Sequence, residues 1–92
     1  MIRKFKHKGL KQLFESGNAS GVKPQHLTRI VRILALLETS EVIDDINLPG
    51  LDLHKLKGER KEEWAVKVSG NWRITFKLEH SDVFDVNYED YH

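Results

Sequence analysis

The stretch WAVKVSGNWRITFKL, residues 64–78, decides the fold of this 92-residue chain. Apolar side chains alternate with polar or small ones on both sides of Ser69-Gly70-Asn71. That alternation is typical of two half-buried strands, and the Gly-Asn pair between them is typical of a tight turn. The stretch therefore predicts an antiparallel β-hairpin.

The length of the turn determines which side chains face each other across the hairpin. A two-residue loop would pair Val68 with Arg73 and put a charge among apolar side chains, so a loop of three residues, 69–71, is predicted. The pairs that follow are Val68 with Trp72, Val66 with Ile74, Trp64 with Phe76 and, on the other face, Lys67 with Arg73.

A second turn at 79–82 precedes a third strand, residues 83–88, in which Phe84, Val86 and Tyr88 alternate and extend the apolar face. We expect the opposite face of the sheet to be open and positively charged. Its predicted members are Lys67, Arg73, Thr75 and Lys77.

The residues before the hairpin predict two helices. A short opening strand at 2–5 is followed by helical spacing of Leu10, Leu13 and Phe14 up to a stop at Gly17. Pro24 is suited to the first turn of a second helix. The predicted core stripe of that helix is Leu27, Ile30, Val31, Leu34 and Leu37.

The remaining segment, 39–63, is acidic and then basic. It predicts a helical turn at 41–46, a short edge strand at 51–57 that ends at Gly58, and a charged turn at 59–63. The whole chain, residues 1–92, is thus predicted to be a single α+β domain. Its order is β-α-α and then an antiparallel β-meander, with both helices packed on one face of a small sheet.

The composition of the chain excludes several kinds of functional site. There is no cysteine, and the net charge is +1, so disulfides and thiolate metal sites are excluded. No histidine pair has the spacing of a zinc site, and no glycine-rich loop cradles a phosphate, so neither a metal nor a cofactor is expected. The charged start at 1–6 and the lack of a long apolar run predict a cytoplasmic protein without a membrane span.

The imidazole and cationic side chains of the sequence are suited to acid–base cleavage of RNA. Cleavage of RNA needs a base for the 2′-hydroxyl, an acid for the leaving 5′-oxygen, and cations for the phosphate charge. The residues that fit these roles are His54, Lys57, Arg73, Asp90, Tyr91 and His92. Each could instead be an ordinary surface or packing residue.

The chain resembles the HigB toxins of the RelE/ParE superfamily, which are the toxic halves of bacterial toxin–antitoxin pairs. The resemblance covers essentially the whole length. It rests on IRKFKHKGL at 2–10, LHKLKG at 53–58, NWRITF at 71–76 and NYEDYH at 87–92. Two departures are Lys55, where the family often has proline, and the acidic pair Glu62-Glu63 beside the expected basic face.

The resemblance implies a microbial RNase-like fold and a ribosome-dependent endoribonuclease that cuts messenger RNA in the ribosomal A site. It implies neutralisation by a HigA-type helix-turn-helix antitoxin, through which alone operator DNA would be bound. The family's active site falls on the six residues named above. His54 and His92 would share the acid–base roles, Asp90 would tune an imidazole, Lys57 and Arg73 would stabilise the phosphate, and Tyr91 would stack on a base.

Two other functions fit the same sequence. ParE relatives share the fold but inhibit DNA gyrase without cleaving RNA. A plain RNA- or ribosome-binding module would use the basic sheet face alone. Both the endoribonuclease and the plain RNA-binding module would bind RNA through Lys57, Lys67, Arg73 and Lys77. The free protein is expected to be a monomer.

Overall fold

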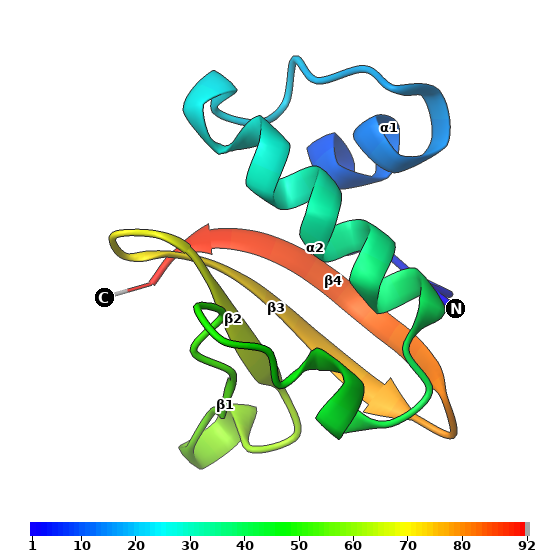
Figure 1. The fold of residues 1–92 in the computed structure, drawn as a ribbon, viewed down its shortest axis with the longest axis vertical. Helices are drawn as coiled ribbons and strands as arrows, with labels where there is room; N and C mark the ends of the chain where they lie inside the picture. The colour runs from blue at the N-terminus through cyan, green and yellow to red at the C-terminus, as the bar shows by residue number, and fades with distance from the viewer. Residues whose placement is uncertain (92) are drawn as a thin grey trace.

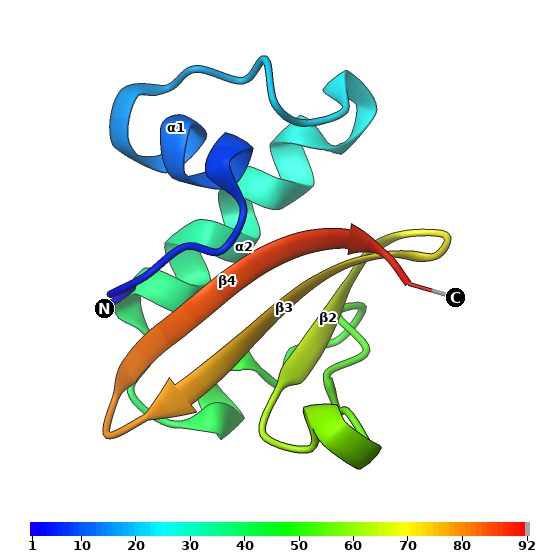
Figure 2. The same ribbon diagram turned by 180° about the vertical axis from the view of Figure 1, so that it is seen from behind.

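A four-stranded antiparallel sheet is the frame of the molecule, with its strands in the spatial order β1-β2-β3-β4 (Figure 1). The computed structural model describes residues 1–91. The strands are β1 (His54–Lys55), β2 (Trp64–Ser69), β3 (Trp72–Glu79) and β4 (Asp82–Asp90). Helices α1 (Lys8–Ser16) and α2 (Leu27–Thr39) lie on one face of this sheet, as Figures 1 and 2 show from opposite sides. The predicted α+β class is confirmed.

The β2–β3 hairpin has the predicted register along its length but not at its turn. Lys67 faces Arg73, and the two apolar pairs beyond it are also as predicted. At the turn, Ser69 rather than Val68 faces Trp72, so the loop has two residues and the prediction of three was wrong. A bulge at Val68 absorbs the extra residue, which keeps the apolar side chains of both strands on one face.

A second bulge changes the face of one predicted core residue. In β4, Asn87 faces Thr75 but Phe84 faces Lys77, so the register shifts around Asp85, whose φ is +53°. Phe84 therefore lies on the face of Lys77, and the prediction that it extends the apolar face was wrong. Val83 enters the core in its place and is fully buried.

Helix α1 is capped at both ends by local chemistry. The Nδ1 atom of His7 accepts a hydrogen bond from the Leu10 amide at 3.1 Å, and Gly17 ends the helix with φ +76°. A 3₁₀ turn, η1 (Pro24–His26), starts with the predicted proline and leads into α2.

The buried side of α2 differs from the prediction at one residue. Val31 is 47% exposed, whereas Ile33 is buried. Ile33 belongs to the same core cluster as Ile46 of the 3₁₀ turn η2 (Ile43–Ile46) and Leu51, and η2 contacts α2 directly. The remaining core positions of α2 are Ile30, Leu34 and Leu37.

The first residues form no regular strand. Ile2 and Phe5 make isolated parallel bridges to Val83 and Val86, so this segment runs beside β4 without completing a ladder (Figure 2). The predicted opening strand was therefore wrong as an element, although the segment is extended. The predicted edge strand is reduced to β1, because only His54 and Lys55 pair with β2.

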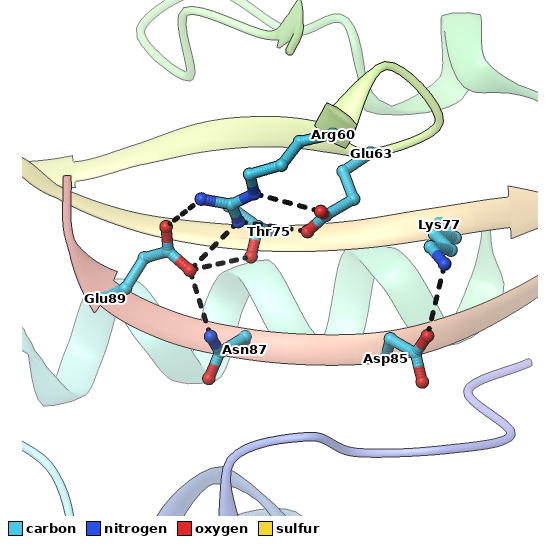
Figure 3. Close-up of polar contacts among 7 residues, drawn as sticks. All are labelled: Arg60, Glu63, Thr75, Lys77, Asp85, Asn87 and Glu89. Atoms are coloured by element: carbon cyan, nitrogen blue, oxygen red, sulfur yellow. Dashed lines mark hydrogen bonds and ion pairs between the residues drawn. The ribbon is translucent and has the colours of Figure 1, made fainter. Parts of the chain in front are cut away.

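The sheet face opposite the helices is not open at its centre. Ala65 and Thr75 lie on that face and are fully buried. The charged turn after β1, η3 (Gly58–Arg60), carries Arg60, whose side chain extends over this face to Glu89, next to Thr75 (Figure 3). The prediction of an open basic face was wrong for this central region, since a 3₁₀ turn and its side chains cover it.

Within residues 1–91, no helix is long and apolar enough to cross a membrane.

Candidate active site

The sheet register brings two of the predicted site residues, His54 and Arg73, onto one face. His54 faces Ala65, Ala65 faces Thr75, and Thr75 faces Asn87 across the four strands. One pair further along, Arg73 lies between Lys67 and Glu89. Cross-strand partners share a face, and so do residues two apart on a strand. His54 and Arg73 therefore lie on the same side of the sheet, away from α1 and α2.

His54 is held in one tautomer by its own loop. Its Nδ1 atom lies 2.9 Å from the carbonyl oxygen of Asp52, and a carbonyl can only accept, so Nδ1 carries the hydrogen. In the neutral ring, Nε2 is then left as the acceptor. The side chain is partly exposed at the edge of the sheet. This arrangement suits a general base.

Arg73 has one donor that the fold leaves unused. Its Nη1 atom donates to the carbonyl oxygens of Gly70, at 2.6 Å, and Trp72, at 3.1 Å. Its Nε atom is buried and has no hydrogen-bond partner within residues 1–91. A buried donor without a partner is energetically costly.

Arg60, a residue that the sequence reasoning did not place in the site, lies in the middle of this face (Figure 3). Its Nε and Nη2 atoms bind the Glu63 carboxylate at 2.9 and 3.0 Å. Its Nη1 and Nη2 atoms bind the Glu89 carboxylate at 2.7 and 3.1 Å. Thr75 and Asn87 complete the group by donating to Glu89 at 3.4 and 2.9 Å. We call these five residues the Arg60 network.

The Arg60 network is a set of paired charges. Hydrogen bonds from Arg60 lower the pKa of Glu63, and the two carboxylates raise the pKa of Arg60. One cation and two carboxylates leave this part of the face with an excess negative charge. The three-residue spacing of Arg60 and Glu63 could have signalled their pairing, whereas the bond from Arg60 to Glu89 joins residues 29 positions apart and required the fold.

Asp90 and Tyr91, two predicted site residues at the end of β4, lie on opposite faces of the sheet. The amide of Tyr91 donates to the Asn71 carbonyl at 2.8 Å, and the Arg60 guanidinium lies 5.8 Å from the Tyr91 ring centroid. Asp90 instead faces Trp72 across the strands, so it lies on the helix side of the sheet. His92 lies outside the described residues.

The predicted RNA-binding lysines differ in their surroundings. Lys67 is exposed next to Arg73. Lys57 is exposed and directly precedes η3. Lys77 lies toward the other end of β3, and its Nζ atom is 3.6 Å from the Asp85 carboxylate (Figure 3). Lys67 and Arg73 are therefore the cations that lie together near the end of β4.

The site is thus an imidazole with an available Nε2, an arginine with an unused donor and a tyrosine, all on one face beside an exposed lysine. Such a set can take a proton from a hydroxyl and stabilise a phosphate, whereas within residues 1–91 no group of three histidine or acidic side chains is placed to hold a metal ion.

The fold and the site define a small α+β protein that carries an imidazole, an arginine and an exposed lysine on one face of its sheet. The model of the HigB-like toxin family, described as RelE-like toxins of type II toxin–antitoxin systems, matches residues 3–92. The chain is 48% identical, over 92 residues and the full length of both proteins, to a curated protein of Proteus vulgaris named endoribonuclease HigB. The chain therefore belongs to the HigB family of type II toxins, and it is the toxin half of a pair that includes a cognate antitoxin.

A solved structure supports the fold. A conserved hypothetical protein from Helicobacter pylori superposes with a TM-score of 0.50 at 14% identity, over 97% of this chain and 96% of its own. At this identity the likeness concerns the fold alone.

Proposed function

We propose that this toxin is an endoribonuclease that cleaves messenger RNA in the ribosomal A site and so stops translation in the cytoplasm. The relative from Proteus vulgaris is named an endoribonuclease, and it aligns without truncation at either end. The observation that carries the proposal is the placement of His54 and Arg73 on one face of the sheet, with Nε2 of His54 available as an acceptor.

The proposed reaction is acid–base cleavage without a metal. A base takes the proton of the 2′-hydroxyl, the 2′-oxygen attacks the phosphorus, and an acid returns a proton to the departing 5′-oxygen, which leaves a 2′,3′-cyclic phosphate. His54 suits the base because its Nδ1 hydrogen is fixed by Asp52. His92 would then be the acid, and Asp90 would tune its imidazole, as the resemblance implies.

Cations would stabilise the charge that develops on the phosphate oxygens. Arg73 brings a cation to the face that carries His54. Lys57 and Lys67 are exposed and can reach the neighbouring phosphates, with Lys77 further along the strand. Tyr91, whose backbone amide donates a hydrogen bond to the Asn71 carbonyl oxygen, would stack on a base.

The decisive experiment measures growth arrest and message cleavage on induction of single variants. His54→Ala, His92→Ala and deletion of residues 90–92 should abolish both effects while the purified proteins keep the circular dichroism and unfolding midpoint of the parent. His80→Ala is the matched control, because His80 is exposed in the β3–β4 turn far along the sheet. A folded truncation that still arrests growth would refute the proposal.

Mapping RNA ends separates the two rival functions. A gyrase inhibitor would produce a DNA-damage response with intact messages and would not need His54. A plain RNA-binding module would tolerate His54→Ala and His92→Ala but lose binding in the double variant Lys67→Ala, Arg73→Ala, with a steep salt dependence. Cleavage of message on purified ribosomes, compared with the same message free in solution, tests the ribosome dependence.

The antitoxin is proposed to be a HigA-type helix-turn-helix protein that alone contacts operator DNA. Co-expression with each neighbouring reading frame should restore growth in one case. Sedimentation of the free toxin should show a monomer, and failure of both frames to restore growth would count against the proposed partner.

A further inference from the structure

A pocket of about 520 Å³ lies on the helix side of the sheet, at the end where β4 finishes and opposite the face that carries His54. Its walls include His7, Lys23, Trp72, Tyr88 and Asp90. The volume is in the range of small-molecule sites. None of the roles proposed for RNA cleavage uses this cavity, except that Asp90 belongs to both.

The floor of the pocket is a stack of aromatic rings. The Trp72 and Tyr88 ring centroids are 4.6 Å apart with an interplanar angle of 33°, and His7 meets the Tyr88 ring edge-on at 5.4 Å. Trp72 is only partly buried, so one part of its indole faces the cavity. A partly exposed indole beside stacked rings is a platform on which a further planar ring can stack.

A buried hydrogen bond holds this platform. The Tyr88 hydroxyl lies 2.6 Å from Nδ1 of His26, and both side chains are buried. The His26 ring also lies 5.8 Å from the Trp72 ring, measured between centroids. The rings are therefore fixed by the fold before any ligand arrives, which reduces the entropic cost of binding.

The loop that supplies the opposite wall is also fixed. Gly21 packs directly on Gly9 of α1, so closely that a Cβ atom added at Gly21 would lie 2.6 Å from the Gly9 Cα. The Asn18 side chain accepts a hydrogen bond from the Ser20 amide at 3.1 Å. These contacts place Lys23 above the indole, with its Nζ atom 5.4 Å from the ring centroid.

The rim combines both signs of charge. Lys23 is exposed and its ammonium can move from the indole to an incoming phosphate. Asp90 lies on the same side of the sheet as Trp72, where its carboxylate can accept hydrogen bonds from ring or amino N–H groups. The ligand that matches an aromatic floor, one mobile cation and one carboxylate is a nucleotide.

We infer that this pocket binds a nucleotide of the RNA strand next to the one that is cleaved, with the base stacked on Trp72 and a phosphate at Lys23. The inference rests on the proposed function, because it takes RNA as the substrate. Asp90 lines the pocket, and the next residue, Tyr91, lies on the other face of the sheet. A strand that passes around the end of β4 would contact the pocket and the cleavage face in succession. The stacking gives a preference for purines, whose rings are larger.

The test uses the fluorescence of Trp72. The chain has two tryptophans, so the Trp64→Phe variant leaves Trp72 as the sole indole. Titration of this variant with adenosine 5′-monophosphate should quench the emission to saturation, cytidine 5′-monophosphate should require a higher concentration, and ribose 5-phosphate should have no effect. Adding Lys23→Ala should weaken adenylate binding about fivefold, the upper effect of one exposed charge pair. Adding Lys11→Ala, an exposed lysine of α1 outside the pocket, should leave it unchanged.

Absence of saturable quenching, equal quenching by ribose 5-phosphate, or equal effects of Lys23→Ala and Lys11→Ala would each overturn the inference. Message cleavage by the Trp64→Phe variant is measured in parallel on ribosomes. Cleavage without nucleotide quenching refutes the pocket and leaves the proposed function intact. Quenching without cleavage by the parent protein refutes the proposed function and leaves a nucleotide site.

Discussion

Arg60 binds Glu89 with both ends of its guanidinium: Nη1 lies 2.7 Å from Oε1 and Nη2 lies 3.1 Å from Oε2. The two residues are 29 positions apart, so this pair ties η3 to the end of β4. Because Glu63 binds the same guanidinium, Arg60 holds the 3₁₀ turn over the buried centre of the sheet face. The charge available for a phosphate is consequently concentrated at Lys67 and Arg73.

Replacing Arg60 by methionine should destabilise the protein by about 1–3 kcal/mol, because Glu63 and Glu89 would be left partly buried and facing each other. The matched control is Arg3→Met. Arg3 pairs with Asp82 at 3.0 Å, but its side chain is 51% exposed, so its loss should cost less than about 1 kcal/mol. Urea unfolding followed by circular dichroism measures both. Equal losses in the two variants would show that the Arg60 network does not stabilise the fold.

The register of the β2–β3 hairpin could be predicted because alternation has a period of two, and one apolar face must be buried. The bulges at Val68 and Asp85 could not, since each inserts one residue into a strand without interrupting its apolar pattern. They explain why the loop length and the face of Phe84 were predicted wrongly.

The same limit applies to α2. Val31 and Ile33 are both apolar, and helical spacing alone gave the core position to Val31. The structure buries Ile33 instead, in the same core cluster as Ile46 of η2 and Leu51. This contact joins segments whose proximity is a property of the whole fold.

Val83 and Val31, whose burial is the reverse of what the sequence pattern predicts, should therefore respond differently to the same change. Val83→Thr should cost about 2 kcal/mol, because a hydroxyl would enter a fully buried site. Val31→Thr should cost less than about 0.5 kcal/mol, because Val31 is 47% exposed. The measurement is the free energy of unfolding in urea at fixed pH. A larger loss for Val31→Thr would mean that α2 is rotated relative to the structure.

The candidate site was predictable in part for a chemical reason. His54 and Arg73 stand out by residue type, and the predicted hairpin register already placed Arg73 beside Lys67. Whether these roles are catalytic stays a prediction. The position of Arg60 on this face could not be predicted, because it depends on a contact with Glu89, which is 29 positions away in the sequence.

The stability of the fold should fall as the pH drops below about 6.5. Burial, and to a smaller extent the charge of Lys23, lowers the pKa of His26 below its ordinary value of 6.5, and burial also lowers the pKa of His7. The unfolded chain therefore binds more protons than the folded chain once the pH falls below 6.5, and protonation favours unfolding. The free energy of unfolding should be constant from pH 8 to about 7 and then decline.

The contribution of His26 can be isolated by comparison of two variants. His26→Gln should flatten the decline between about pH 6.5 and 5, because the buried imidazole is gone. His80→Gln, at an exposed turn residue, should leave the decline unchanged. Unfolding in urea across this pH range is the measurement. An identical pH dependence in the parent and in His26→Gln would contradict the assignment.

Gly9 should be the position where a standard stabilising substitution fails. Alanine in place of glycine inside a helix normally stabilises by about 1 kcal/mol. At Gly9, however, a Cβ atom would lie 2.8 Å from the Gly21 carbonyl oxygen and 2.9 Å from the Gly21 Cα, and both are backbone atoms that cannot turn aside. Gly9→Ala should therefore destabilise by about 1–3 kcal/mol, the usual cost of overpacking.

Lys11→Ala, on the exposed side of the same helix, should change stability by less than about 0.5 kcal/mol. Thermal and urea unfolding test both variants, and a Gly9→Ala protein as stable as the parent would mean that α1 and the 18–23 loop can separate without cost. Because that loop carries Lys23, a destabilised Gly9→Ala protein should also bind adenylate more weakly than the parent does.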